Sequence, residues 1–203
     1  DTELPSSHFF YLRIDYPHPQ AVRAEGVYVW DADGRRIIDA SGGPVLVNIG
    51  HGVAEVAQAI AEQVRALAYV HATVFTTPAL EEYSERLAAH VPLEDPRFYY
   101  LTSGSEAVEA ALKFVRQFML THDEATREAI ISRWGSYHGA TLGTLAITGK
   151  PKMRTMFAPL FLDQPHIPPP YCYRCPFGYS PLSLSGRGAG GEGCDLACAR
   201  ALE

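Results

Sequence analysis

Hydrophobic residues recur with a helical period in four segments of the chain. In residues 53–67, apolar side chains return every three or four positions, which predicts an amphipathic helix. A second helix is predicted over 77–90, where a threonine suited to the N-cap is followed by proline at the first helical position. Residues 107–120 carry a strong helical pattern, and residues 140–148 predict a shorter helix of small residues.

Strand-like segments lie before and between these helices. A hairpin is predicted near the start, with strands at 27–30 and 35–39 and a turn in which Gly34 supplies the positive φ angle. Further along, residues 97–101 and 129–132 are predicted to be strands, and each leads into a helix. This alternation of strand and helix predicts an α/β domain with a largely parallel sheet.

The chain is predicted to contain parts of two domains. Residues 1–50 form an N-terminal arm and hairpin that belong to a small α+β domain, and residues 51–203 form the first part of a larger one. Within the larger part, residues 163–194 are rich in proline, glycine and cysteine and predict a long irregular loop. Residues 195–203 predict the start of another helix. So few strands would leave the sheet poorly covered, and we therefore expect a truncated chain.

The composition is that of an ordinary soluble globular protein, with 47% hydrophobic and 20% charged residues. A formal net charge of −6 gives no reason to expect nucleic acid or an anionic membrane as a partner. No apolar run approaches the roughly 20 residues that a membrane-spanning helix needs, and no signal peptide is visible. These features predict a cytoplasmic protein.

The first candidate site lies where the predicted strand at 97–101 passes into a helix through Ser103, Gly104 and Ser105. A helix N-terminus offers unpaired backbone N–H groups and a partial positive charge, which favours a phosphate. Gly104 allows close approach of the backbone, and the two serines can donate hydroxyl groups. A simpler interpretation remains open, in which the serine only caps the helix.

The second candidate site is Tyr137 with His138, which follows the predicted strand at 129–132. Ligands of α/β sheets bind at the carboxyl ends of strands, where an aromatic side chain can stack on a planar ring. The histidine can assist through a hydrogen bond or by titrating near neutral pH. Alternatively, both side chains belong to a loop that is packed only for stability.

Together, these segments resemble the N-terminal portion of class III (omega-type) aminotransferases, which are enzymes of the pyridoxal-phosphate (PLP)-dependent transferase fold type I. The resemblance runs from about residue 26 to residue 161. The matching segments are, in chain order, 26–31 with Gly34 and Asp39, the sequence Asn-Ile-Gly-His at 48–51, residues 102–113, the sequence Tyr-His-Gly-Ala-Thr at 137–141, and Phe157 with Pro159. The ordered series is specific, although each motif alone is weak.

The resemblance implies that Ser103, Gly104, Ser105, Tyr137 and His138 bind PLP. Gly104 and Ser105 would hold the phosphate through backbone amides and a hydroxyl group, in agreement with the helix-terminus argument. Tyr137 would stack on the pyridine ring, and His138 would lie beside it.

The resemblance also implies a substrate-binding segment and a homodimer. Ser41, Gly42 and Gly43 fall where the family lines the substrate entrance. The family works as a dimer in which each subunit completes the site of its partner, and residues 75–77 lie in the segment expected near this shared boundary.

No catalytic residue is assigned within the chain. Its lysines are Lys113, Lys150 and Lys152, and none matches the family's Schiff-base lysine. We expect that lysine, and the aspartate that pairs with the pyridine nitrogen, to lie beyond the chain end. PLP chemistry needs both groups, so we expect transaminase activity of the full-length parent and not of this fragment.

Four cysteines form a candidate metal site. Cys172 and Cys175 make one closely spaced pair, and Cys194 and Cys198 make another, with eighteen residues between the two pairs. This spacing is compatible with a structural zinc ion, and reduced free thiols are the alternative.

The leading hypothesis is an enzyme that transfers an amino group from an amino acid or amine to a 2-oxo acid. An aminomutase or a decarboxylase of the same fold remains possible. The alternatives from other classes are a non-catalytic or zinc-stabilised fragment and a nucleotide-binding α/β protein. The nucleotide-binding alternative lacks both the G-x-G-x-x-G and the G-x-x-x-x-G-K-[ST] sequences.

Overall fold

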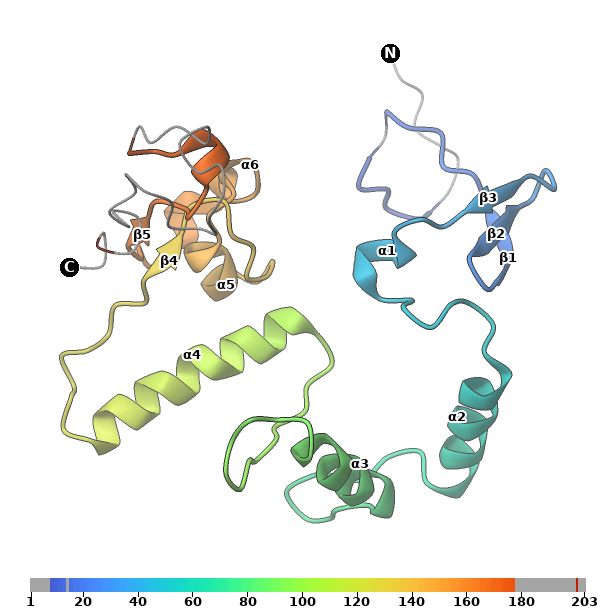
Figure 1. Ribbon diagram of the computed structural model, residues 1–203, viewed down its shortest axis with the longest axis horizontal. Helices are drawn as coiled ribbons and strands as arrows, with labels where there is room; N and C mark the ends of the chain where they lie inside the picture. The colour runs from blue at the N-terminus through green and yellow to red at the C-terminus, as the bar shows by residue number, and fades with distance from the viewer. Residues whose placement is uncertain (1–7, 14, 178–199, 201–203) are drawn as a thin grey trace, which may run out of the picture. The chain divides into compact units, whose positions relative to one another are not determined.

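The computed structural model describes residues 8–13, 15–177 and 200. The chain divides into two compact units, Asp1–Val91 and Pro92–Glu203, and each is treated by itself (Figure 1). The predicted boundary between domains after residue 50 stays a prediction.

The first unit begins with a three-stranded antiparallel sheet in the order β1-β2-β3. Its strands are β1 (Ala21–Glu25), β2 (Tyr28–Asp31) and β3 (Arg36–Ile38). In the pairing of β2 with β3, Tyr28 lies opposite Ile38. The predicted hairpin is therefore confirmed, and β1 adds a third strand to it.

The turn between β2 and β3 is held by one buried carboxylate. Asp31, which is 3% exposed, accepts hydrogen bonds from the backbone N–H groups of Asp33 and Arg35. It also accepts one from Arg35 Nε at 2.7 Å. Burial raises the pKa of Asp31, but the hydrogen bonds and charge of Arg35 outweigh it and leave the pKa lowered. Gly34 completes the turn with a φ angle of 79°.

Three helices follow the sheet in the first unit. They are the short kinked α1 (Gly42–Val45), α2 (Ala54–Ala66) and α3 (Pro78–Ala88). The predictions over 53–67 and 77–90 are confirmed within one or two residues at each end, which is the ordinary uncertainty of a helix boundary. Neither α2 nor α3 contains a buried residue.

The second unit is built on the long helix α4 (Gly104–Thr121), which confirms the helix predicted over 107–120 (Figure 1). After it come β4 (Ser132–Arg133) and α5 (Leu142–Ile147). Short elements complete the described part of this unit: α6 (Pro151–Arg154), the 3-10 helix η1 (Thr155–Leu160), β5 (His166–Ile167) and the 3-10 helix η2 (Cys172–Arg174).

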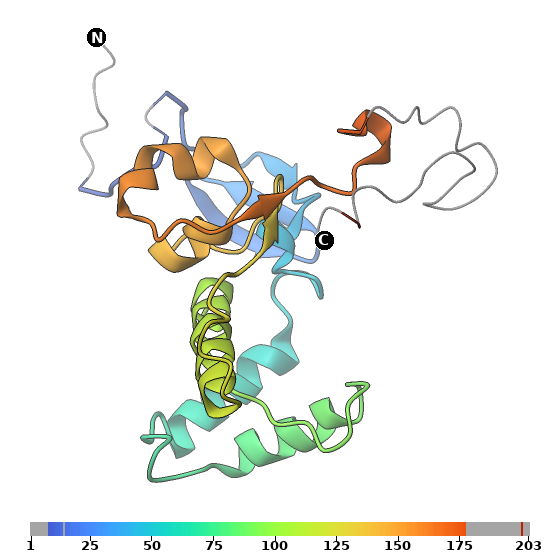
Figure 2. The ribbon, with the colours of Figure 1, turned by 90° about the vertical axis from the view of Figure 1, so that its left-hand side faces the viewer.

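Strand content is lower than predicted. No strand forms over 97–101, because a strand needs a ladder of hydrogen bonds and nothing in the described residues pairs with this segment. The strand predicted over 129–132 is reduced to β4, since the Ile130 N–H donates to the Gln164 side chain at 2.7 Å instead. β4 pairs in parallel with β5, and Figure 2 shows the two lying side by side. The predicted parallel pairing is therefore present on a small scale.

The predicted irregular loop over 163–194 is partly wrong, because β5 and η2 lie within it. Pairing with β4 orders its first part. Residues 178–194 lie outside the described residues. The helix predicted over 195–203 also lies there, apart from residue 200.

The best-buried part of the second unit is α5. The side chains of Thr144, Leu145, Ala146 and Ile147 are buried there, and Thr148 at its end is fully buried. No helix in the described residues is long and apolar enough to cross a bilayer.

Candidate functional site

The two predicted cofactor-binding segments of the second unit meet at one hydrogen bond. The Ala140 N–H donates to Ser105 Oγ at 3.1 Å, although the two residues are 35 positions apart. Because this bond uses a lone pair of the Ser105 oxygen, the hydroxyl proton stays available to a ligand. The N-terminus of α4 and the loop that carries Tyr137 and His138 therefore lie next to each other.

The N-terminus of α4 is capped by its own sequence. Ser103 Oγ accepts a hydrogen bond from the Glu106 N–H at 3.2 Å, and its hydroxyl donates back to the Glu106 carboxylate at 3.1 Å. Ser103 thus caps the helix, as the simpler interpretation of this motif predicts, and its role as a cofactor-binding residue stays a prediction. Within the described residues, the N–H groups of Gly104 and Ser105 have no acceptor. These two amides are the ones that remain for a ligand.

Glu106 brings a negative charge to the same helix end. Its carboxylate accepts hydrogen bonds from the hydroxyl groups of Thr102 and Ser103, and these lower its pKa. The charge stabilises the helix dipole when no ligand is bound. An anion at Gly104 and Ser105 has to share this end with the carboxylate, so Glu106 moderates the positive potential there.

The predicted stacking residue is accessible from solvent. The Tyr137 side chain is 53% exposed, and Lys150 Nζ lies 5.4 Å from the centre of its ring. His138 is half-buried, and its backbone N–H donates to Thr148 Oγ1 at 3.1 Å. The Thr148 hydroxyl lies within hydrogen-bonding distance of the carbonyl groups of Gly139 and Thr144. A fully buried threonine thus fixes the backbone beside the exposed ring.

Gly139 sits where no larger residue fits. A Cβ atom added there would lie 2.5 Å from Thr144 Oγ1 and 2.8 Å from Ser105 Oγ. Its φ angle of 140° is also one that residues with side chains rarely adopt. The glycine of the Tyr-His-Gly sequence is therefore required by the close approach of α4 and α5.

The predicted substrate-binding residues lie in the first unit. Ser41 precedes α1, and Gly42 and Gly43 have φ angles of 58° and 65°. Val45 also has a positive φ angle, 63°, which is uncommon for a β-branched residue. The loop therefore has an unusual backbone path that two glycines permit.

One side-chain pair holds this loop. Asp39 Oδ1 accepts the Gly42 N–H, and Asp39 Oδ2 lies 2.9 Å from His51 Nε2. The His51 hydrogen bond lowers the pKa of Asp39, partial burial opposes it, and backbone N–H groups of the loop add to the lowering. The His51 backbone exchanges two hydrogen bonds with Gly26 at the end of β1. Asp39 and His51 therefore anchor residues 41–43 to the sheet.

These anchoring residues were not assigned a role from the sequence. Asp39 and His51 occur in the series of family motifs, but only the structure brings them together across twelve positions. Glu109, Thr144 and Thr148 were also missed. Their hydrogen bonds join segments that no local pattern connects.

The segment expected near a subunit boundary has local hydrogen bonds of its own. Thr77 Oγ1 accepts the Leu80 N–H at 3.2 Å and so caps α3. Thr76 Oγ1 donates to Glu81 Oε1 at 2.5 Å. Phe75 is 61% exposed. A role of residues 75–77 in a dimer stays a prediction.

The candidate zinc site gains no support from the described part of the chain. Among those residues, no group of three or more histidine, cysteine, aspartate or glutamate side chains is placed to hold a metal ion. Cys175 is a free, half-buried cysteine. Cys194 and Cys198 lie outside the described residues, as does the side chain of Cys172.

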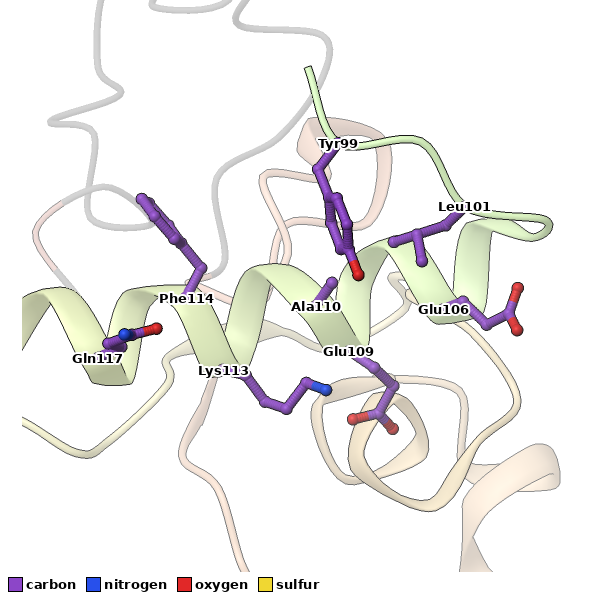
Figure 3. Close-up of a pocket in the computed structure, with 8 residues that line it drawn as sticks. All are labelled: Tyr99, Leu101, Glu106, Glu109, Ala110, Lys113, Phe114 and Gln117. Atoms are coloured by element: carbon purple, nitrogen blue, oxygen red, sulfur yellow. The ribbon is translucent and has the colours of Figure 1, made fainter. Parts of the chain in front are cut away.

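An open pocket of about 410 Å³ runs along α4. Figure 3 shows Tyr99 and Leu101 above the helix, with the side chains of Glu109 and Lys113 projecting from its other side. The pocket is thus near the first turns of α4, but it is not lined by Tyr137 or His138.

The chain is similar to known proteins over most of its length. The family model Aminotransferase class-III matches residues 13–180. A probable aminotransferase of Mycobacterium tuberculosis is 36% identical over 182 residues, which are 90% of this chain and 39% of the relative.

Two solved structures are similar in fold as well as sequence. One is an (S)-enantioselective omega-transaminase from Thermomicrobium roseum, with a TM-score of 0.78, 33% identity, and coverage of 86% of this chain and 40% of that one. The other is an amine transaminase from an uncultivated Pseudomonas species in its PLP-bound form, with a TM-score of 0.80 and 30% identity. The match covers 86% of this chain and 41% of that one. The chain thus spans about 40% of the length of these relatives.

Proposed function

Because this chain belongs to the class-III aminotransferase family and has the first part of the PLP-dependent transferase fold of type I, we propose that the whole protein is a PLP-dependent aminotransferase. It would transfer an amino group from an amino acid or amine to a 2-oxo acid. The observation that carries the proposal is the contact between Ser105 and Ala140, which joins a helix N-terminus to the loop of an exposed aromatic ring.

The N-terminus of α4 fits the phosphate of the cofactor. The N–H groups of Gly104 and Ser105 have no acceptor in the described residues, and a Cβ atom at Gly104 would meet nothing within 4 Å. A phosphate there would accept hydrogen bonds from these two N–H groups and from the Ser105 hydroxyl group. Ser103, whose hydroxyl is engaged with Glu106, would shape the site through its cap.

Tyr137 and His138 fit the planar ring. The exposed Tyr137 side chain can stack on a pyridine ring, and the half-buried His138 is held beside it through Thr148. When bound, PLP supplies an electron sink for the carbon that exchanges its amino group. The residues of this chain would orient the cofactor and limit its motion, which lowers the entropy cost of reaction.

The substrate would enter beside Ser41, Gly42 and Gly43. The loop of these residues is held by Asp39 and His51, so its backbone groups can be presented in a fixed geometry. We further propose a cytoplasmic homodimer in which residues 75–77 lie near the subunit boundary. The Schiff-base lysine and the ring-nitrogen aspartate would lie outside these 203 residues.

An aminomutase or decarboxylase would use the same cofactor site. Transfer is favoured because the matching family and both solved neighbours are transaminases by name. The described residues offer no feature that favours zinc as a second ligand.

The experiment is a PLP titration of the full-length protein followed by an assay for amino transfer. We expect a visible absorption band of the bound cofactor, which changes when an amino donor is added. Ser105→Ala should weaken PLP binding on the order of tenfold, as expected for one hydrogen bond to a charged group. Thr121→Ala removes a hydroxyl from the other end of α4 and should leave binding unchanged. Failure of the wild-type protein to bind PLP would overturn the proposal.

A further inference from the structure

Helix α5 is capped by a residue of another helix. Thr141 occupies its N-cap position, but the Thr141 side chain makes no capping hydrogen bond. The N–H group of Thr144, in the first turn, instead donates to Glu109 Oε1 at 3.2 Å. The Thr141 hydroxyl also donates to Glu109 Oε1, at 2.6 Å. Glu109 of α4 therefore accepts the hydrogen bond that an N-cap side chain normally accepts.

The Glu109 carboxylate lies close against the first turn of α5. A Cβ atom at Gly143 would lie 2.6 Å from both carboxylate oxygens of Glu109, so a side chain there would displace the carboxylate. Glu109 is half-buried, and its negative charge faces the positive end of α5. Figure 3 shows its side chain projecting from α4.

Glu109 stands one helical turn after Ser105. Residues four apart lie on the same face of a helix, so both side chains reach toward the same partner segment. Ser105 accepts the Ala140 N–H, and Glu109 receives the hydrogen bonds of Thr141 and Thr144. Two points of one helix face thus hold the chain directly after Tyr137 and His138.

From this juxtaposition we propose that Glu109 is a positioning residue of the cofactor site. It fixes the separation between the phosphate-binding end of α4 and the Tyr137 ring. The inference rests on the proposed function, but it concerns a residue to which that function assigns no contact with the cofactor. Removing the carboxylate frees the N-terminus of α5 and lets the Tyr137 loop move relative to Ser105.

The test uses the full-length protein prepared without cofactor and titrated with PLP. Glu109→Ala should bind PLP on the order of tenfold more weakly. Its bound cofactor should also show a weaker visible circular dichroism band, because the ring is less fixed. Glu109→Gln keeps the acceptor oxygen and should restore most of both signals. Glu85→Ala, on α3, is the matched control and should behave as wild type.

A double-mutant cycle separates positioning from a general loss of stability. Gly143→Ala should weaken PLP binding by displacing the Glu109 carboxylate. In a Glu109→Ala background, the same change should cost much less, since there is no carboxylate to displace. If the wild-type protein binds PLP and Glu109→Ala gives the same affinity and dichroism, the inference is wrong while the proposed function stands. Equal costs of Gly143→Ala in both backgrounds would also contradict it.

Discussion

The loop at 39–43 and the segment at 137–144 both carry predicted site residues, but they are held in different ways. In the first, one hydrogen-bonded pair, Asp39 with His51, holds a backbone that glycines allow to take positive φ angles. In the second, buried hydroxyl groups of threonines and close packing against α4 hold the chain. The first segment depends on one half-buried carboxylate, that of Asp39. The second depends on shape, on buried hydroxyl groups and on the Glu109 carboxylate that α4 presents to Thr141 and Thr144.

This difference fits the tasks that we propose for the two segments. A cofactor that stays bound needs a site of fixed shape, which packing provides. A segment that meets changing substrates needs only a defined backbone path, which a single anchor provides. We therefore expect the two segments to respond differently to bulk, to loss of a hydroxyl and to acid.

Replacing a glycine by a larger residue should distinguish the two segments most strongly. Gly139→Val should destabilise the protein by about 3 kcal/mol, because the side chain collides with Ser105 and Thr144 and the φ angle is unfavourable. Gly43→Ala in the other segment meets nothing within 4 Å, so its cost should be about 2 kcal/mol, from its φ and ψ angles of 65° and −139° alone. Urea unfolding of the two variants measures the difference. Equal costs would contradict the packing argument.

Loss of one buried hydroxyl should have the next largest effect. Thr148→Val keeps the shape but leaves the His138 N–H and the Gly139 carbonyl without their partner, at a cost of about 1–3 kcal/mol. Thr155→Val is the matched control, since its hydroxyl also donates to a carbonyl four residues back but is exposed. The control should change stability by less than about 0.5 kcal/mol. Unfolding curves that coincide for both variants would show that burial is unimportant here.

Removal of the charge in the first segment should act locally. Asp39→Asn weakens two hydrogen bonds of this side chain, one with His51 and one from the Gly42 N–H. Amide hydrogen exchange in residues 41–43 should then be on the order of tenfold faster, while exchange at Thr148 stays unchanged. Mass spectrometry of exchanged peptides measures both regions in one experiment. Faster exchange in both regions would mean that the segments are coupled.

Acid should produce the smallest effect of the four. The folded pKa of Asp39 is below its ordinary value of 3.8, so its contribution is fully present above that pH. The contribution is lost as the pH falls through the lowered pKa. As the pH falls below 3.8, protection of the Gly42 amide should begin to decline, and Asp39→Asn should remove this dependence. A decline that persists in Asp39→Asn would assign it to another group.

The sequence predicts the helices of this protein better than its strands. The periodicity of α2, α3 and α4 is a local property, and each helix lies within a few residues of its prediction. The segment 97–101 has an equally clear apolar pattern, but a strand also requires a partner, and nothing in the described residues pairs with it. Tyr99 accordingly remains 79% exposed. Pairing is a long-range property that a local pattern does not contain.

The candidate site shows the same division. Ser103 as a helix cap is a local signal, and the structure confirms it. That Glu109 lies on the same face as Ser105 also follows from helical spacing. Helical spacing does not predict that this face meets Thr141 and Thr144, which lie 32 and 35 residues after Glu109. The motif series placed the contributing segments in the right family, and only the fold shows which side chains join them.

The capping of α5 by Glu109, a residue of α4, has a consequence for the order of folding. A helix of six residues is far below the length at which an isolated helix is stable in water. Its capping partner lies on α4, so the chain must close a loop of more than thirty residues before the cap forms. We expect α4, whose contacts are local, to form early in refolding, and α5 to form only when the two meet. The segment carrying Tyr137 would then be among the last parts of this unit to take its shape.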